Sequence, residues 1–271
     1  MTPQQRAITV ALGILFGIIS VLPHAWLRID AGNSFTGVEI QATDAETHYA
    51  SRVRETYDGE PLAANVYFAG SKNQPYFFPP LPEFTIAVIG KIFGLDAARA
   101  VLLSRFLFGA ALWFVMAGLF TAMSGRWSAS LLATAAVMFA GPVFSGPWIV
   151  TQLLQGTAGA IEFLPFSRPV NPEWSLTLFF AALWTFTVWS KTSSRRALAA
   201  AGLFTVAAYY SYIYVWTVLL VVYGVYGIRA LIRRDGSRTR QLLILGSALA
   251  LGVIPYAWNM WQASLHPDYA E

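Results

Sequence analysis

Long apolar runs joined by short polar segments make up most of this chain. A membrane-crossing helix needs about 20 mostly apolar residues, because about 30 Å of hydrocarbon divides by a rise of 1.5 Å per residue. The stretch 197–232 carries no charge before Arg229 and is too long for one crossing, so it predicts a helical hairpin that turns near Ser211. The pattern therefore predicts an all-α, polytopic transmembrane helical bundle with seven spans, at residues 7–27, 97–123, 128–148, 174–190, 197–211, 213–232 and 242–260.

Composition points to the same class of protein. Of the 271 residues, 56% are apolar and 12% are charged, whereas an ordinary soluble domain carries about 25% charged residues. These values exclude a soluble enzyme, a disordered chain and a nucleic-acid-binding domain, so no nucleic acid partner is expected. The sequence has no cysteine, which excludes disulfides, thiol nucleophiles and thiolate metal sites. Its three histidines lie far apart and give no metal-ligand spacing.

Charges are sorted between the two sides of the predicted bundle. With the N-terminus in the cytoplasm, the inner segments hold 10 basic residues and one acid, and the outer segments hold 13 of the 14 acids. The short loops 124–127, 191–196 and 233–241 obey the positive-inside rule, which predicts an external C-terminus. The basic segment 229–240 then has no expected role beyond setting this topology and meeting anionic lipid headgroups.

Two segments could reverse this topology. The apolar stretch 81–93 is too short to cross, and a crossing there would turn every later basic loop outward, so we expect it to lie flat in the outer interface. The run 7–27 lacks a small-x-small cleavage site and predicts an uncleaved anchor. A long first outer loop, residues 28–96 with two interfacial helices, follows from these two assignments.

The first outer loop contains the candidate chemistry. Thr43 and Glu46 form a capping box, which predicts a helix that runs to about Asp58 before Gly59 and Pro61. Its weak apolar face holds Ala45, Tyr49, Val53 and Thr56, and its polar face holds Asp44, His48, Ser51 and Glu55. Asp44 has two interpretations from spacing alone: a first-turn carboxylate that favours the helix dipole, or a general base. Arg52 and Arg54 are interpreted as solvated charges on this helix.

Four short motifs follow one another in an order that is similar to a known superfamily. They are Asp44-Ala45-Glu46-Thr47-His48-Tyr49-Ala50, Pro79-Pro80-Leu81, Lys91-Ile92-Phe93-Gly94 and Ala98-Arg99. With the N-terminal span before them, they resemble the GT-C superfamily of integral membrane glycosyltransferases, which includes protein mannosyltransferases and aminoarabinose transferases. The resemblance covers residues 1–260 and the seven-span module. It depends on the order of these elements along the chain.

The resemblance implies an inverting transferase that moves a sugar from a polyprenyl-phosphate donor to a hydroxyl of a glycan, lipid or protein acceptor on the outer face. By this resemblance Asp44 is the catalytic base. Substrate-binding roles fall to His48, Tyr49, Arg99, Arg105, Glu162 and Arg168. Arg99 and Arg105 offer fixed positive charge for the leaving phosphate, although snorkelling or pairing with a carboxylate also explains Arg105.

Several departures from the superfamily leave alternatives open. Phe77-Phe78 stand where members of the superfamily often have charged residues directly before Pro-Pro-Leu. No second pair of acids occurs between residues 145 and 173, so the sequence does not decide whether the reaction needs a divalent metal. Glu173 is interpreted as a first-turn carboxylate. The tyrosines at 209, 210, 212 and 214 are explained by an interfacial aromatic belt, and a platform for a sugar is the alternative.

Two other classes of function remain as alternatives. The missing acid pair and the short C-terminus favour a non-catalytic subunit that binds the lipid carrier or acts as a scaffold. A transporter is less favoured because no internal repeat is visible. In each case we expect a single membrane domain over 1–271 in the envelope membrane of a bacterial or archaeal cell. Relative to the superfamily, a truncated fragment, a minimal form and half of a complex are the alternatives.

Overall fold

The computed structural model describes residues 2–35, 44–62, 66, 72, 74–144, 166 and 170–265. Within these residues the chain is all helical, without a strand. The nine α-helices of the described residues are α1 (Pro3–Ala31), α2 (Asp44–Asp58), α3 (Leu81–Ile92), α4 (Ala97–Ser124), α5 (Trp127–Phe144), α8 (Glu173–Thr192), α9 (Arg195–Tyr209), α10 (Ile213–Ile232) and α11 (Gly236–Ser264), and a 3₁₀ turn (Gly32–Ser34) follows α1.

Polar residues at the ends of the apolar runs begin and end these helices. The side chains of Thr2, Asp96, Ser194 and Asp235 accept hydrogen bonds from the first turns of α1, α4, α9 and α11. Each cap satisfies a backbone N–H that has no partner within the helix. At the end of α4, Gly125 adopts φ 70° and closes the helix with a bond to Thr121. The turn at Tyr210–Tyr212 separates α9 from α10, close to the predicted turn at Ser211.

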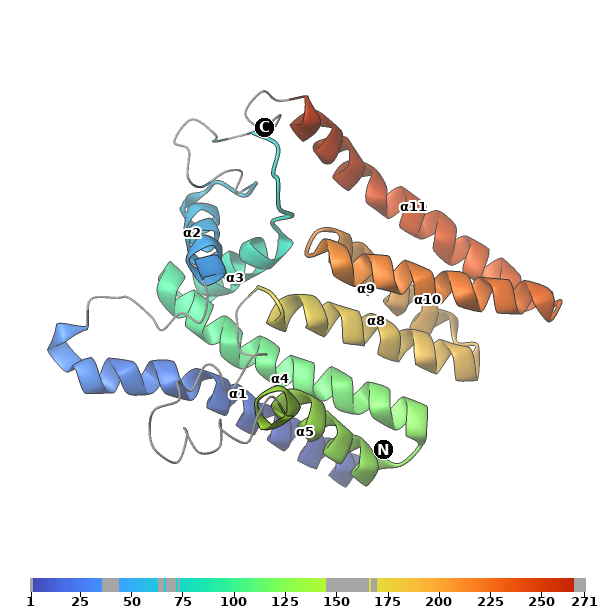
Figure 1. Cartoon of the computed structure of the whole chain (residues 1–271), viewed down its shortest axis with the longest axis horizontal. Coiled ribbons are helices and arrows are strands. Elements are labelled where there is room, and N and C mark those ends of the chain that lie inside the picture. Colours follow the sequence, from blue (N-terminus) through green and yellow to red (C-terminus); the bar gives the residue numbers. More distant parts are fainter. Residues whose placement is uncertain are drawn as a thin grey trace.

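The long helices form a stack. In Figure 1, α1, α4, α8 and α9 lie side by side, with α5 against α4, and with α10 and α11 beyond α9. Glycines bring neighbours close together: a Cβ at Gly17 would lie 2.6 Å from the carbonyl oxygen of Phe106, and one at Gly118 would lie 2.6 Å from the Trp184 ring. Small residues allow this close packing between helices in membranes.

Two ends of the stack differ in character. One end, here called the α2–α3 end, carries α2 and α3 above the start of α4. The opposite end is here called the basic end. It contains the segments that carry the 10 basic residues assigned to the inner side by the sequence analysis. There Lys191 donates to the carbonyls of Ala122 and Met123, and Arg238 donates to Ser190 O at 3.2 Å. These bonds tie α4, α8 and α11 together.

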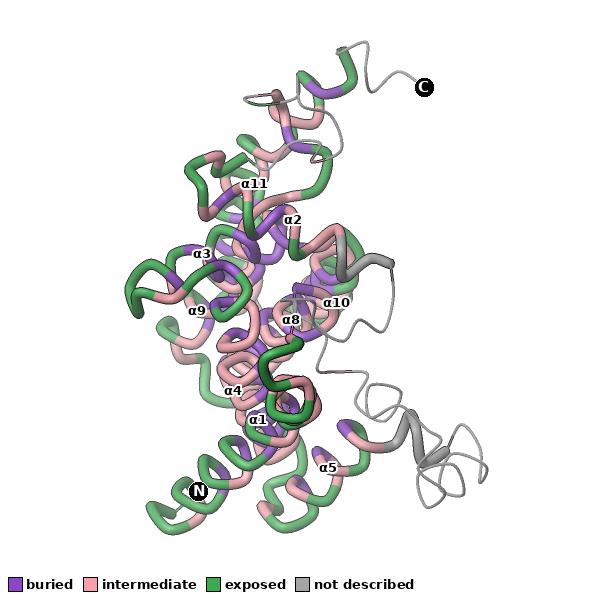
Figure 2. Tube along the Cα trace, turned by 90° about the vertical axis from the view of Figure 1, so that its left-hand side faces the viewer, coloured by how far each residue is buried: buried purple, intermediate pink, exposed green. Residues whose placement is uncertain are grey.

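Four of the helices in the described residues are long and apolar enough to cross a membrane: α1 with its 3₁₀ turn, α4, α10 and α11. Figure 2 shows buried residues along the middle of the stack and exposed ones on its outer helices. α8 and α9 are inner helices, so they tolerate Ser and Thr, whose hydroxyls bond to their own helix, as Thr185 does to Ala181 O. The described helices thus indicate a membrane protein.

Candidate functional site

The apolar face of α2 fixes that helix to the bundle. Val53 is 1% exposed and packs, together with Tyr49, in a cluster with Ile86 of α3, Ala100 and Phe108 of α4, and Val170 before α8. This is the weak apolar face predicted from the spacing. Its packing places the middle of α2, at Tyr49 and Val53, against α4 and the residue that lies three positions before α8.

A buried ion pair joins α2 to α3. Arg52 Nε lies 2.7 Å from Glu83 Oε1, with side chains 0% and 2% exposed, and Arg52 Nη2 donates to Phe78 O at 2.7 Å. The interpretation of Arg52 as a solvated charge is therefore wrong. Arg54, two residues on, faces away from the bundle and forms the exposed pair with Asp58. The difference arises because α3 covers one side of α2, which helix periodicity alone does not show.

Phe78 connects this pair to His48. The His48 ring meets the Phe78 ring edge-on at 5.6 Å, and the Arg52 guanidinium lies 5.9 Å from the centre of the same ring. Burial lowers the pKa of His48 below its ordinary 6.5, and the charge of Arg52 lowers this pKa further. His48 is therefore held in its neutral form at neutral pH.

The proline-rich segment is anchored to distant helices. Tyr76 N–H donates to Asn259 Oδ1 at 3.2 Å, and Asn259 Nδ2 donates to Tyr76 O at 2.8 Å, so one amide of α11 satisfies both backbone groups. Leu81 N–H donates to Tyr210 O at 3.0 Å. Burial raises the pKa of the Tyr76 phenol to about 12. This segment therefore closes the α2–α3 end against the α9–α10 hairpin and α11.

A second polar cluster lies between α1, α4 and α8. Glu173, the first residue of α8 as predicted, is fully buried, and neither carboxylate oxygen has a hydrogen-bond partner among the described residues. Arg105 of α4 is 4% exposed and interacts electrostatically with Glu173. Gly109 makes room for them, since a Cβ there would lie 3.2 Å from Glu173 Oε1 and 3.2 Å from Ser20 Oγ. Arg105 thus faces an acid inside the bundle.

Arg99 occupies a different side of α4. Six residues of α-helix turn through about 240°, so Arg99 and Arg105 point apart. Arg99 is 64% exposed, lies 3.5 Å from Asp96, and stands beside an apolar groove of about 400 Å³ between α1 and α4. The other walls of the groove are Ile18, Val21, Leu22, Ala25, Leu95, Leu102, Leu103 and Phe106.

The remaining predicted site residues are described only in part. Asp44 begins α2, one turn before His48 and two turns before Arg52, but its side chain lies outside the described residues. Glu162, Arg168 and the cap residue Thr43 also lie outside the described residues. The structure therefore gathers His48, Tyr49 and the start of α2 at one place, and Arg99 and Arg105 on two sides of α4.

Sequence reasoning missed Glu83 as a partner and underrated Glu173. Each is an acid in or beside an apolar helix, and a buried acid of this kind needs a counter-charge. The aromatic-belt interpretation is also wrong in part, because Tyr209 is 2% exposed and Tyr210 OH donates to Gly252 O at 2.9 Å, although Tyr214 is exposed.

No three His, Asp or Glu side chains within the described part of the chain form a group that could hold a metal ion. Compared with known proteins, the chain matches no family model, no curated protein and no solved structure.

The lowered pKa of His48 predicts a pH dependence of stability. Below about pH 6.5 the unfolded chain binds a proton at His48 that the folded chain resists, so the melting temperature falls as the pH falls; above 6.5 the group has no effect. We expect the His48→Gln variant to lose the part of the pH dependence of the melting temperature that His48 causes. Thermal unfolding in detergent between about pH 7.5 and about pH 5 measures it. Identical pH profiles for the wild type and the variant would contradict the prediction.

Proposed function

We propose that this chain is a membrane glycosyltransferase of the GT-C type, with its site at the α2–α3 end. One observation carries the proposal: Tyr49 and Val53 pack against α4 and Val170, so the helix that begins with Asp44 and carries His48 lies beside the junction where Arg105 and Glu173 are buried. A helix that starts with a carboxylate thus lies next to a bundle interior that holds fixed charges.

The reaction follows from these groups. The Asp44 carboxylate accepts the proton of an acceptor hydroxyl. The acceptor oxygen then bonds to the anomeric carbon while the bond from that carbon to the lipid phosphate breaks, which inverts the configuration. The polyprenyl phosphate leaves with the bonding electrons, and a guanidinium stabilises its negative charge.

The groove beside Arg99 suits the lipid part of the donor. Its walls are apolar along α1 and α4, and a single cation stands at the α3–α4 junction. A polyprenyl chain can lie in such a groove with its phosphate at the guanidinium. His48 and Tyr49 would then contact the sugar, and Arg105, which interacts electrostatically with Glu173, would place a guanidinium inside the bundle.

The proposed topology has seven crossings, with the N-terminus in the cytoplasm and the C-terminus and the α2–α3 end outside. It is supported by the gathering of 10 basic residues at the opposite end. Because the chain lacks cysteine, single cysteines report on it directly. We expect Asp58→Cys to react with an impermeant maleimide in intact cells, and Ser237→Cys to react only after lysis. The reverse pattern would contradict the topology.

Transfer by the purified chain tests the proposed function. The chain is reconstituted in vesicles with polyprenyl-phosphate sugars and hydroxyl acceptors, and the glycosylated product and released polyprenyl phosphate are measured. We expect turnover with at least one donor, and no turnover with any donor would contradict the proposal.

In this assay Arg99→Gln should raise the KM for the donor about tenfold, because a charge-assisted contact to phosphate is lost. Arg54→Gln is the matched control, since Arg54 is an exposed arginine that pairs only with Asp58 among the acids of the described residues. An equal KM for the two variants would exclude Arg99 from donor binding.

A second function, binding of the lipid carrier without catalysis, is supported by one feature, the groove beside Arg99. A subunit that binds the lipid carrier without catalysis needs the apolar groove and the guanidinium but no base. Donor binding that depends on Arg99, together with turnover only after addition of a catalytic partner, would select this function.

A further inference from the structure

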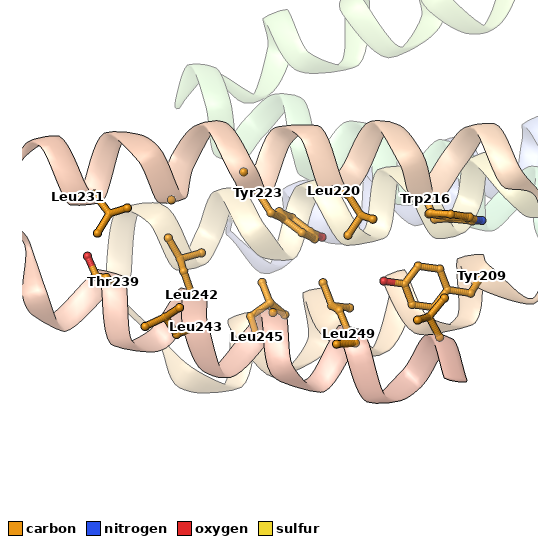
Figure 3. A pocket seen from close by; sticks show the side chains of 15 residues that line it. Tyr209, Trp216, Leu220, Tyr223, Leu231, Thr239, Leu242, Leu243, Leu245 and Leu249 are labelled. Carbon is orange, nitrogen blue, oxygen red and sulfur yellow. The ribbon is translucent and has the colours of Figure 1, made fainter. Parts of the chain in front are cut away.

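A second apolar groove runs between α10 and α11, away from the proposed transferase site. Its volume is about 590 Å³, which lies within the range of about 300–1,000 Å³ typical of ligand pockets. Figure 3 shows leucines from both helices facing this space, with Leu231 and Thr239 at one end and Tyr209 and Trp216 at the other. From Leu231 to Trp216 the groove follows about 22 Å of helix, which exceeds half of the hydrocarbon thickness of about 30 Å.

Glycines keep this groove open. Gly224 and Gly227 of α10 and Gly246 of α11 line it, and a Cβ built at each meets no heavy atom within 4 Å. Small residues in membrane helices usually mark close helix contacts, as Gly17 and Gly118 do here. At these three glycines the described chain instead leaves open space beside the helix.

Positive charge lies at one end of the groove. A smaller pocket of about 130 Å³ shares Leu242 with it and is lined by Arg229, Arg233 and Arg238. Asp235 lies 3.5 Å from Arg238, whereas no acid in the described part of the chain forms an ion pair with Arg229 or Arg233. The smaller pocket thus combines excess positive charge with a lining residue, Leu242, that it shares with an apolar groove.

We propose that this site binds an anionic phospholipid. The headgroup phosphate lies against Arg229 and Arg233, and one acyl chain lies in the groove between α10 and α11. Charge complementarity favours an anionic headgroup, and the position of the smaller pocket beside the groove, with Leu242 in the lining of both, favours an amphiphile over a free anion. Tyr226 in the same pocket is a residue type that favours headgroup depth. The site lies at the basic end, so it does not depend on the transferase proposal.

Lipid retention by the full chain tests the proposal. The purified protein in detergent is incubated with dioleoyl phosphatidylglycerol or dioleoyl phosphatidylcholine, and bound lipid is counted by native mass spectrometry. We expect retention of phosphatidylglycerol and much weaker retention of phosphatidylcholine. Loss of both charges in Arg229→Gln/Arg233→Gln should weaken phosphatidylglycerol binding about 30-fold.

Two further variants make the test specific. Arg195→Gln/Arg196→Gln removes two exposed charges at the same end but outside the pocket, and should retain the lipid. Gly224→Leu/Gly246→Leu fills the groove and should lower retention without lowering the melting temperature, since both sites are open. If this variant does not fold, the comparison of Arg229→Gln/Arg233→Gln with Arg195→Gln/Arg196→Gln decides the test.

Three results would overturn the proposal. The first is equal retention of the two lipids, or equal loss in the two arginine variants. The second is inorganic phosphate raising the melting temperature as much as phosphatidylglycerol does, with no effect of Gly224→Leu/Gly246→Leu, which would indicate an anion site without a lipid chain. The third is a dimer that Gly224→Leu/Gly246→Leu converts to a monomer, which would place a second copy of the chain in the groove.

Discussion

Replacement of Arg52 by methionine is expected to destabilise the protein by about 3–5 kcal/mol, because it leaves the charge of Glu83 buried without its partner. Glu83 is 2% exposed, and Arg52 Nε donates to its carboxylate at 2.7 Å, while Arg52 Nη2 donates to Phe78 O. Methionine keeps the length and apolar stem of arginine but cannot donate. Thermal or denaturant-induced unfolding in detergent measures the loss.

A double variant separates the pair from its surroundings. In Arg52→Met/Glu83→Leu no buried charge remains, so most of the stability should return. Arg54→Met is the matched control, since its pair with Asp58 is exposed at 65% and 50% and such pairs contribute about 0–1 kcal/mol. Equal effects at positions 52 and 54 would show that the buried pair does not hold α2 against α3.

Replacement of Asp44 by asparagine is expected to slow sugar transfer by about 10²–10⁴-fold, the usual contribution of a general base. Asparagine has nearly the same shape and still suits the start of a helix, so the fold should remain. The effect should fall on kcat, because the proton is transferred after the substrates bind. Initial rates in reconstituted vesicles measure it.

The alternative role of Asp44 gives a different result. If Asp44 only interacts favourably with the helix dipole, the variant loses about 0.3–1 kcal/mol of stability and keeps its rate. Asp58→Asn is the control, because it makes the same change at the exposed end of α2. Unchanged kcat in Asp44→Asn would remove Asp44 as the base but would leave lipid binding at Arg99 to be judged by its own variant.

The sequence by itself determined where the helices lie. The apolar runs predict the bounds of the long helices to within a few residues. For α4 the observed bounds are Ala97–Ser124 and the predicted ones 97–123. The end of α2 at Asp58 was also predicted, because it depends on Gly59 and Pro61, which lie within one turn of the helix end. Local signals decide local structure, and they succeed wherever no distant segment intervenes.

Only the tertiary structure decided which charges are buried and which lie together. Arg52 and Arg54 look alike on a single helix, but α3 covers only Arg52, whose partner Glu83 is 31 residues away. In the same way Arg99 borders a groove of α1, whereas Arg105 faces Glu173 of α8. The physical reason is that burial and Coulomb energy depend on distances between side chains of different helices. Helix periodicity sets the direction of each side chain, and the packing of the other helices decides what that side chain meets.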